Sequence, residues 1–432
     1  MTEARLASPG LREPDASALQ PARRELLALY RVALGAVDGR RRVRDYLRRE
    51  RLLRPVFAAA VGKAAVPMLR GAVDALGAGI EGALVVAPEQ ACGELPSHLT
   101  ALRCLVAAHP VPDARSLAAG EALVAFLEGL PPEGSVLFLT SGGASSLVEL
   151  PAPGVSLELL REANRWLLAS GLPIHAMNRV RKALSSIKGG RLARHLMGRP
   201  VLHLLMADVP GDDPASVGSG LLVAHSPEQL TARGLVLPEW LAEMVRGSPP
   251  PAPDHAFRGV RHAVVACSAH ARAAVAHLGR KLGYSIIRHD QLLVGEARQV
   301  GPRLAERLKA SSPGLQVWSG ETTVRLPASP GRGGRCQTLA LAAAVELAGS
   351  PDILLLAAGT DGRDGASEDA GALIDGGTVA RGELAGLSAA ECLSRADAGT
   401  FLAESGDLIH TGPTGTNVMD LVLIEVQSRD AG

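Results

Sequence analysis

The segment TSGGASSL, residues 140–147, is the stretch of this sequence whose residue types most clearly suggest chemistry. It follows the apolar run from Ser135 to Leu139 and precedes a helical pattern. Backbone amides of a glycine-rich turn at the start of a helix can hold an anion such as a phosphate. Glycine-rich turns also serve packing alone. The segment therefore indicates either a phosphate cradle or a tight packing turn.

Two further turns of the first half carry reactive side chains. GKAA, residues 62–65, follows the run from Pro55 to Val61 and places Lys63 on the first turn of a helix. ADVPGDD, residues 207–213, follows the run from Val201 to Met206 and contains three aspartates. Such carboxylates can hold Mg²⁺ or act as a base, although aspartate beside proline and glycine is also ordinary turn chemistry.

The second half of the sequence repeats this arrangement. GRGGRCQ, residues 331–337, combines glycines with Arg332 and Arg335, whose guanidinium groups match a phosphate or a carboxylate. GTDGRDG, residues 359–365, looks like part of a calcium-binding loop but lacks the rest of an EF-hand. TGPTGTNVMD, residues 411–420, is too dense in polar residues and glycines to be only a turn. Both halves thus contribute polar turns to a candidate site.

The elements that must position these turns alternate between apolar runs and helical stretches, which is typical of a doubly wound α/β sheet. A first helix is expected from Arg23 to Val37. The expected strands are Pro55–Val61, Ala83–Ala87, Ser135–Leu139, Val201–Met206, His262–Cys267, Tyr284–Ile287, Leu315–Ser319, Thr322–Leu326, Ile353–Ala358 and Leu421–Val426. Ligands of such sheets bind beyond the carboxyl ends of the strands, which is where the polar turns lie.

The length of 432 residues predicts two domains of roughly 200 residues each. Residues 247–254, GSPPPAPD, separate them, because consecutive prolines lack the backbone donors that a helix or a central strand needs. We expect a flexible tail over residues 1–20, a Rossmann-like α/β domain over residues 21–250 and a second α/β domain over residues 251–432. Each is expected to hold a mainly parallel sheet flanked by helices, with a cleft between the two domains.

The composition argues against several classes of partner. The 45 Lys and Arg residues nearly balance the 44 Asp and Glu residues, so no net field attracts nucleic acid or an anionic membrane. Aromatic residues make up 3% of the chain, which leaves few platforms for stacking bases. No apolar run approaches the roughly 18 residues of a membrane span. The arginine-rich segment over residues 40–51 indicates the solvated face of an amphipathic helix, with a partner contact as the alternative.

The cysteine pattern indicates a reducing compartment. The five cysteines are scattered and include no C-x-x-C pair, which argues against structural zinc; they are Cys92, Cys104, Cys267, Cys336 and Cys392. The N-terminal stretch has no apolar core after its charged residues. We therefore expect a cytoplasmic protein.

Taken together, the glycines, hydroxyls, carboxylates, lysine and arginine at successive strand ends indicate binding of a phosphate chain with its metal. Phosphoryl transfer needs positive charge and amides on the moving group, carboxylates for Mg²⁺ and a base for the acceptor. The sequence contains no G-x-x-x-x-G-K-[ST] motif and no protein-kinase set of H-R-D and D-F-G. An ordinary P-loop enzyme and a protein kinase are thereby excluded.

The motifs in their order resemble those of the glycerate 2-kinases that carry a MOFRL domain. The resemblance extends from about residue 22 to residue 426. It rests on GKAA, HPVPD, TSGGASSL, NRVRKALSSIKGGRLA, DVPGDDP, SGETTV, GTDGRDG and GDLIHTGPTGTNVMDL. It implies a MOFRL-like second domain and an enzyme that uses ATP with Mg²⁺ to phosphorylate the 2-hydroxyl of D-glycerate, with the active site between the domains. ATP and D-glycerate or a similar hydroxy acid are the implied partners, and a homodimer is compatible with the sequence.

The resemblance also implies roles for individual residues. Lys63 matches the lysine of the GKAA motif and Arg335 the arginine of the GGR motif, and both are taken as catalytic together with Asp208, a base or metal ligand. The implied nucleotide and phosphate ligands are Ser141, Gly142, Gly143, Ser145, Ser146, Lys188, Gly189, Gly190, Thr414, Gly415 and Asn417. Candidate metal ligands are Asp208, Asp212 and Asp361, and candidate substrate ligands are Glu321 and Arg332.

The sequence departs from the family pattern at several polar positions. Cys336 and Thr338 stand where the family tends to carry the asparagine and glutamate of GGRNQE, Ala269 stands in place of the asparagine of a GSN turn, and Ser367 begins the segment that is usually TDA. Three interpretations stay open: a kinase with altered contacts, a kinase of a related hydroxy acid, and a weakly active paralogue. A non-catalytic binding protein and a hydroxypyruvate reductase are rivals, although G-x-G-x-x-G follows none of the expected strands.

Overall fold

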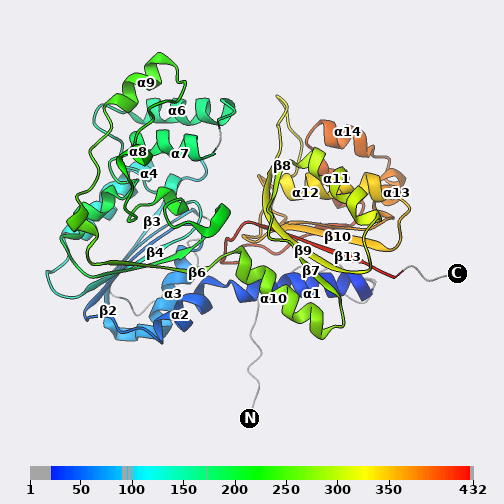
Figure 1. The fold of residues 1–432 in the computed structure, drawn as a ribbon, viewed down its shortest axis with the longest axis horizontal. Coiled ribbons are helices and arrows are strands. Elements are labelled where there is room, and N and C mark those ends of the chain that lie inside the picture. The colour runs from blue at the N-terminus through cyan, green and yellow to red at the C-terminus, as the bar shows by residue number, and fades with distance from the viewer. Residues whose placement is uncertain (1–20, 90–94, 96–98, 100, 173, 429–432) are drawn as a thin grey trace, which may run out of the picture. The chain divides into compact units, whose positions relative to one another are not determined.

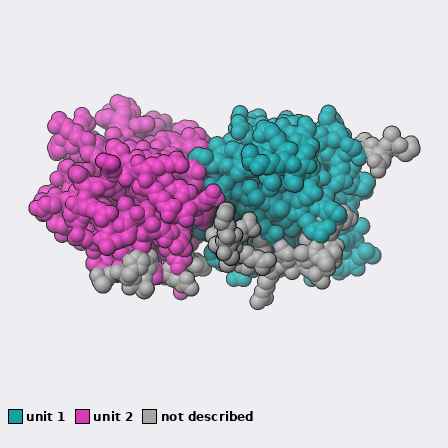
Figure 2. Space-filling model, turned by 90° about the horizontal axis from the view of Figure 1, so that it is seen from below, with its two compact units in different colours: residues 1–37, 268–432 teal, residues 38–267 magenta. Residues whose placement is uncertain are grey.

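The computed structural model describes residues 21–89, 95, 99, 101–172 and 174–428. The chain forms two compact units, a first one of residues 38–267 (magenta, labelled unit 2 in Figure 2) and a second one that combines residues 1–37 with residues 268–432 (teal, labelled unit 1 in Figure 2). The tail expected over residues 1–20 and the cysteine Cys92 lie outside the described residues.

The first unit is built on a parallel sheet of six strands in the order β3-β2-β1-β4-β5-β6. The strands are β1 (Val56–Val61), β2 (Ile80–Ala87), β3 (Leu102–Val106), β4 (Ser135–Thr140), β5 (Val201–Met206) and β6 (Val260–Ala266). This is the strand order of dinucleotide-binding Rossmann sheets, in which the chain reverses its direction of winding between β1 and β4. The loops that leave these two strands therefore lie at the topological switch point.

Helices cover both faces of the first sheet (Figure 1). On one face lie α2 (Gly39–Leu47) and α3 (Ala65–Leu76), and on the other lies α4 (Ala114–Glu128). Asp38 caps α2 by accepting a hydrogen bond from the backbone N–H of Arg41, which confirms the helix expected in the arginine-rich segment. The remaining helices of this unit are α5 (Ala144–Leu147), α6 (Leu157–Ala169), α7 (Ile174–Ala183), α8 (Pro227–Leu230) and α9 (Glu239–Arg246).

The second unit contains a mixed sheet in the order β12-β11-β10-β13-β9-β7, with β8 paired to β9. The strands are β7 (Ile286–Arg288), β8 (Leu293–Glu296), β9 (Gly314–Thr323), β10 (Ile353–Gly359), β11 (Gly371–Ile374), β12 (Leu408–Ile409) and β13 (Asp420–Val426). Each adjacent pair from β12 to β9 in this row is antiparallel, whereas β7 and β8 run parallel to β9. The α/β class is confirmed, but this sheet differs from the mainly parallel one expected. Strands buried on both faces are continuously apolar in either orientation, so their sequence does not reveal direction.

Helices also cover both faces of the second sheet. On one face lie α1 (Pro21–Ala36) and α10 (Ser268–Lys281), and on the other lie α11 (Ala297–Lys309) and α12 (Arg335–Leu347) (Figure 1). The smaller helices are α13 (Thr378–Leu384), α14 (Ala389–Ser394) and α15 (Ala398–Glu404). The main core of this unit lies between α11, α12 and the sheet, around residues such as Leu341, Leu355 and Phe401.

The division into units differs from the predicted boundary at residues 250 and 251. The strand β6 pairs in parallel with β5 and so completes the first sheet. The proline segment stays with the same unit, because the guanidinium of Arg191 donates to the carbonyls of Pro249 and Pro250. The helix α1 belongs instead to the second unit, where Arg23 forms ion pairs with Asp375 and Asp407.

Candidate functional site

The loops that leave β1 and β4 are joined by two hydrogen bonds at the switch point. The backbone N–H of Lys63 donates to the carbonyl oxygen of Gly142 at 2.9 Å, and the N–H of Ala64 donates to the hydroxyl oxygen of Ser141 at 2.9 Å. Ser141 is fully buried, so its hydroxyl serves the loop contact. The structure therefore brings the GKAA and TSGGASSL segments together, as the strand-end rule predicts.

Gly143 lies where the side chains of Lys63 and His109 approach the loop. Its φ of +83° is a left-handed conformation that favours glycine. A Cβ atom at this position would lie 2.9 Å from Cδ2 of His109 and 3.3 Å from Cγ of Lys63. The stem of Lys63 and the ring of His109 thus both approach Gly143, and the absence of a side chain there is a steric requirement.

The other two serines of the loop, Ser145 and Ser146, are held within the first unit. The hydroxyls of Ser145 and Ser219 lie 2.8 Å apart, and the hydroxyl of Ser146 donates to the carbonyl of Gly143 at 3.1 Å. Ser219 belongs to the segment after the acidic turn, so the TSGGASSL loop also contacts that segment. Hydrogen bonds thus link the segments GKAA, TSGGASSL and 217–220 into one group of loops.

Lys188, Gly189 and Gly190 support this group of loops from the interior of the first unit. The ammonium of Lys188 is buried in an ion pair with Glu149. The N–H groups of Gly189 and Gly190 donate to the carbonyls of Ser219 and Gly220 at 3.0 and 2.7 Å. Their polar groups are engaged within the protein, which gives these three predicted phosphate ligands a structural role in the conformation described.

The acidic turn after β5 is anchored by a lysine that sequence reasoning missed. Lys182 donates to the carbonyl of Ala215 at 3.3 Å and lies 2.6 Å from Nε2 of His225. Nδ1 of the same imidazole lies 2.7 Å from the carbonyl of Val223, so Nδ1 carries the proton and Nε2 accepts from the lysine. Burial lowers the pKa of Lys182 to about 8. The sequence does contain a pointer to this lysine, because Lys182 belongs to the motif NRVRKALSSIKGGRLA, on which the family resemblance rests.

The aspartates of this turn do not form a preformed metal cage. Asp208 follows β5 and is partly buried, and Asp212 has a φ of +53°. In the part of the chain that the structure describes, no group of three or more His, Cys, Asp or Glu side chains is placed to hold a metal ion. Magnesium in kinases is commonly bound by one or two carboxylates together with substrate phosphates, and a single aspartate fits that arrangement.

In the second unit, Arg335 is the first residue of α12 and is clamped between two carboxylates. Its Nε and Nη2 atoms donate to the two oxygens of Asp420 at 2.6 and 2.9 Å, and its Nη1 lies 3.2 Å from Oε1 of Glu321. Burial lowers the pKa of Arg335, but the charges of Asp420 and Glu321 outweigh burial and raise the pKa above its ordinary value. The guanidinium is therefore a permanent cation in a fixed orientation.

A third carboxylate, that of Asp364, occupies the N-terminus of α12. It accepts hydrogen bonds from the N–H groups of Cys336 at 3.0 Å and Gln337 at 2.7 Å. Burial and then the nearby charge of Asp420 raise the pKa of Asp364 to about 7. These amides are thus engaged by the protein's own side chain, and among the groups at this helix start the guanidinium of Arg335 is the one suited to bind an anion.

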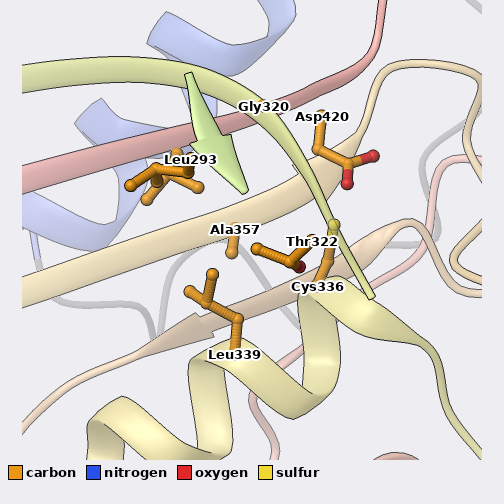
Figure 3. Close-up of a pocket in the computed structure, with 8 residues that line it drawn as sticks. Leu293, Gly320, Thr322, Cys336, Leu339, Ala357 and Asp420 are labelled. Carbon is orange, nitrogen blue, oxygen red and sulfur yellow. The ribbon is translucent and has the colours of Figure 1, made fainter. Parts of the chain in front are cut away.

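Two departures from the family pattern lie on the inner side of α12. The hydroxyl of Thr338 donates to the carbonyl of Gly334 at 2.7 Å. Cys336 is buried and lines a narrow pocket together with Asp420, Thr322 and Leu293 (Figure 3). The pocket has room for about one water molecule. Both replacements are therefore accommodated within the fold beside the Arg335 clamp.

The other predicted residues of the second unit gather on two loops. The hydroxyl of Thr414 donates to the carbonyl of Thr360 at 2.5 Å, which joins its loop to the one that carries Asp361. Oδ1 of Asp361 and Oδ1 of Asp420 both lie beside Gly359. Gly415 has a φ of +73°, and Asn417 is buried. Arg335, Glu321, Asp361 and Thr414 thus belong to one cluster, to which the structure adds Asp420 and Asp364.

Arg332 is exposed, and two carboxylates hold its side chain and its backbone. Its Nη2 forms an ion pair with Asp369 at 2.6 Å, and its backbone N–H donates to Asp397 at 2.8 Å. Asp369 also accepts a hydrogen bond from Ser367 at 2.8 Å, so the third departure is part of the same network. The expectation that Arg332 binds substrate stays a prediction.

Comparisons with known proteins agree with these motifs. Residues 25–240 match the model of a domain of unknown function, DUF4147, and residues 314–420 match the MOFRL family. The chain is 33% identical to the D-glycerate 2-kinase of Thermotoga maritima over 92% of this chain and 96% of that protein. It is 38% identical, over 74% of this chain and 76% of the relative, to a protein of Agrobacterium vitis provisionally named hydroxypyruvate reductase.

A solved structure shares the fold as well. The crystal structure of glycerate kinase from Thermotoga maritima superposes with a TM-score of 0.80 at 32% identity and covers 94% of this chain and 99% of that one. The protein therefore belongs to the MOFRL-type glycerate kinase family, a family of phosphotransferases. None of the helices in the described ranges is both long enough and apolar enough to span a bilayer.

Proposed function

We propose that this protein transfers the γ-phosphoryl group of ATP to the 2-hydroxyl of D-glycerate, giving 2-phosphoglycerate and ADP. The observation that carries the proposal is the junction of the GKAA and TSGGASSL loops at the β1/β4 switch point, where sheets of this strand order bind nucleotides. The kinase names of relatives that span most of the chain support the same reaction.

The residues of the first unit suit the phosphate side of this reaction. In the proposal, the glycine amides of the TSGGASSL loop cradle phosphate oxygens, and the ammonium of Lys63 neutralises charge on the phosphoryl group as it moves. Asp208 accepts the proton of the substrate hydroxyl while the new O–P bond forms and the bond from the γ-phosphorus to the β-phosphate oxygen breaks. Arg335, which belongs to the second unit, is a further cation that the proposal assigns to the reaction.

Magnesium would enter this scheme with the nucleotide. Bound Mg²⁺ would neutralise charge on the β- and γ-phosphates, and Asp208 or Asp361 would complete its ligands with a single carboxylate. Asp212, which lies in the same turn with a φ of +53°, is the third candidate for this ligand.

The proposal is tested by identifying the product with coupling enzymes. The purified protein is supplied with D-glycerate, ATP and MgCl₂, and 2-phosphoglycerate is detected by adding enolase, whose product absorbs in the ultraviolet. We expect a signal with enolase alone. A signal that needs phosphoglycerate mutase as well would assign the 3-hydroxyl, and the same assay with other 2-hydroxy acids would reveal a different substrate.

Hydroxypyruvate reduction is the second candidate, because two relatives at 38% identity carry that provisional name and the strand order is compatible with a dinucleotide. The turns after β1 and β4 contain GKAA and SGGAS, and neither has the G-x-G-x-x-G pattern that brings a backbone close to a pyrophosphate. We expect no steady loss of NADH absorbance in the presence of hydroxypyruvate. Steady NADH oxidation would favour the reductase.

A further inference from the structure

The guanidinium of Arg335 is shared between two carboxylates that lie in different surroundings. Asp420 binds the Nε and Nη2 atoms and has a side chain that is 7% exposed, whereas Glu321 binds Nη1 and is 49% exposed. Two carboxylates on one guanidinium leave an excess of negative charge beside it. An anion that binds Arg335 must therefore compete with one of them.

The competition is unequal because the two carboxylates differ in the cost of release. Breaking a buried ion pair leaves an uncompensated charge in the protein interior, which is strongly destabilising. A half-exposed carboxylate regains water when it leaves its partner, and exposed ion pairs contribute little net free energy. Glu321 is thus the partner that an incoming anion displaces, and Asp420 is the partner that stays.

The backbone around Glu321 allows this exchange without a change of fold. Glu321 lies near the end of β9, where its backbone pairs with Val294 of β8. Asp420 faces Gly320, the preceding residue of β9, in the β9–β13 pair. With both backbones held in the sheet, rotation of the Glu321 side chain alone uncovers Nη1 of Arg335.

We propose that Glu321 is an exchangeable partner that covers the anion-facing edge of Arg335 until a phosphate or carboxylate of the substrates displaces it. Asp420 acts as a positioning residue that keeps the guanidinium in place during the exchange. The inference rests on the proposed function in one respect, which is that Arg335 binds an anionic group of the substrates. The inference itself states that Glu321 and that anion compete for the guanidinium of Arg335.

The test measures anion binding directly as well as catalysis. Binding of inorganic phosphate is measured by titration calorimetry on wild type, Glu321→Gln and Glu321→Asp, and KM values for ATP and D-glycerate are measured for the same proteins. Glu383→Gln is the matched control, because it removes the same charge from an exposed glutamate on α13. Glu321→Asp keeps the charge but shortens the side chain that reaches Nη1.

We expect Glu321→Gln to bind phosphate about twofold to fivefold more tightly than wild type, which is the range set by exposed ion pairs. The KM that falls identifies the source of the anion: the KM for ATP if it is a phosphate, or that for D-glycerate if it is the carboxylate. Glu383→Gln should bind phosphate as wild type does, and Glu321→Asp should lie between wild type and Glu321→Gln. In an Arg335→Gln background, Glu321→Gln should no longer tighten binding.

The outcomes separate this inference from the proposed function. Unchanged phosphate affinity in Glu321→Gln, or equal tightening in the Arg335→Gln background, would overturn the competition between Glu321 and the anion. Tighter phosphate binding in a protein that does not phosphorylate D-glycerate would support the competition and overturn the proposed function instead. Tightening of the same size in Glu383→Gln would show that general surface charge is responsible, which also contradicts the inference.

Discussion

The hydroxyl oxygen of Ser141 accepts a hydrogen bond from the backbone N–H of Ala64 at 2.9 Å. This bond ties the loop after β4 to the first residues of the loop after β1. The neighbouring bond from the N–H of Lys63 to the carbonyl of Gly142 runs in the same direction. The position of Lys63 relative to the glycine amides therefore depends on a buried serine side chain.

Replacing Ser141 with alanine should disturb both stability and catalysis. The change leaves the buried N–H of Ala64 without this acceptor, which should lower the free energy of unfolding by about 1–3 kcal/mol. A small displacement of Lys63 should lower kcat/KM by roughly 10-fold to 100-fold. The control is Ser156→Ala, which removes a hydroxyl that accepts a hydrogen bond from the backbone N–H of Leu159 at the start of α6, and it should change kcat/KM much less. Loss of stability in Ser141→Ala with normal kcat/KM would mean that the bond does not align Lys63.

Gly143→Ala should impair the site for a steric reason that a control variant can isolate. Gly143 and Gly154 have nearly equal φ values of +83° and +82°, so alanine is strained by about 1–2 kcal/mol at either position. A Cβ at residue 143 also meets His109 and Lys63, whereas nothing lies within 4 Å of a Cβ at residue 154. We expect a fall in kcat/KM for Gly143→Ala only. Equal kinetics in the two variants, measured beside their melting temperatures, would contradict the close approach of Lys63.

The buried carboxyl of Asp364 should make stability depend on pH. Its folded-state pKa of about 7 lies above the ordinary value of 3.8, because burial and Asp420 favour the neutral form. The stabilisation that protonation provides is complete below about pH 4 and is lost as the pH rises through 7. Relative to Asp364→Asn, wild type should therefore lose on the order of 3 kcal/mol between pH 4 and pH 8. A difference in melting temperature between the two proteins that stays constant over this range would contradict the shift.

The strand ends and their polar turns could be predicted from the sequence because the signals are local. The strand Val201–Met206 agrees with β5 at both ends, and the junction of Lys63 with the TSGGASSL loop follows from the rule about carboxyl ends of strands. The assignment of α1 to the second unit could not be predicted in this way, because it depends on contacts between residues far apart in the chain. The spacing of apolar residues reveals α1 as a helix, but its attachment depends on the pairing of Arg23 with Asp375 and Asp407, which are more than 350 residues away in the chain.

The second unit shows the same limit for individual side chains. The sequence indicates that the aspartates of GTDGRDG and TGPTGTNVMD belong to the site. It does not indicate whether an aspartate binds a metal ion or caps a helix. Asp364 caps α12, and Asp420 holds Arg335, because the folding of β10 and β13 side by side brings both to the start of that helix. Neither partner can be read from spacing along the chain.

The central proposal is that the protein phosphorylates D-glycerate with ATP and that this reaction needs the cations of both Lys63 and Arg335. The measurement that tests it most directly is ³¹P NMR of wild type, Lys63→Ala and Arg335→Ala, each incubated with ATP, MgCl₂ and D-glycerate. We predict that wild type forms a phosphomonoester and ADP in equal amounts. In the proposal each cation stabilises charge in the transition state, so removing either one slows the formation of product. Lys63→Ala should retain its melting temperature, whereas Arg335→Ala leaves the buried carboxylate of Asp420 without its partner and should melt at a lower temperature. At a temperature at which both are folded, each variant should form product at least 100-fold more slowly, in keeping with the loss of one such group. Absence of the phosphomonoester with wild type, or its undiminished formation by either variant, would contradict the account.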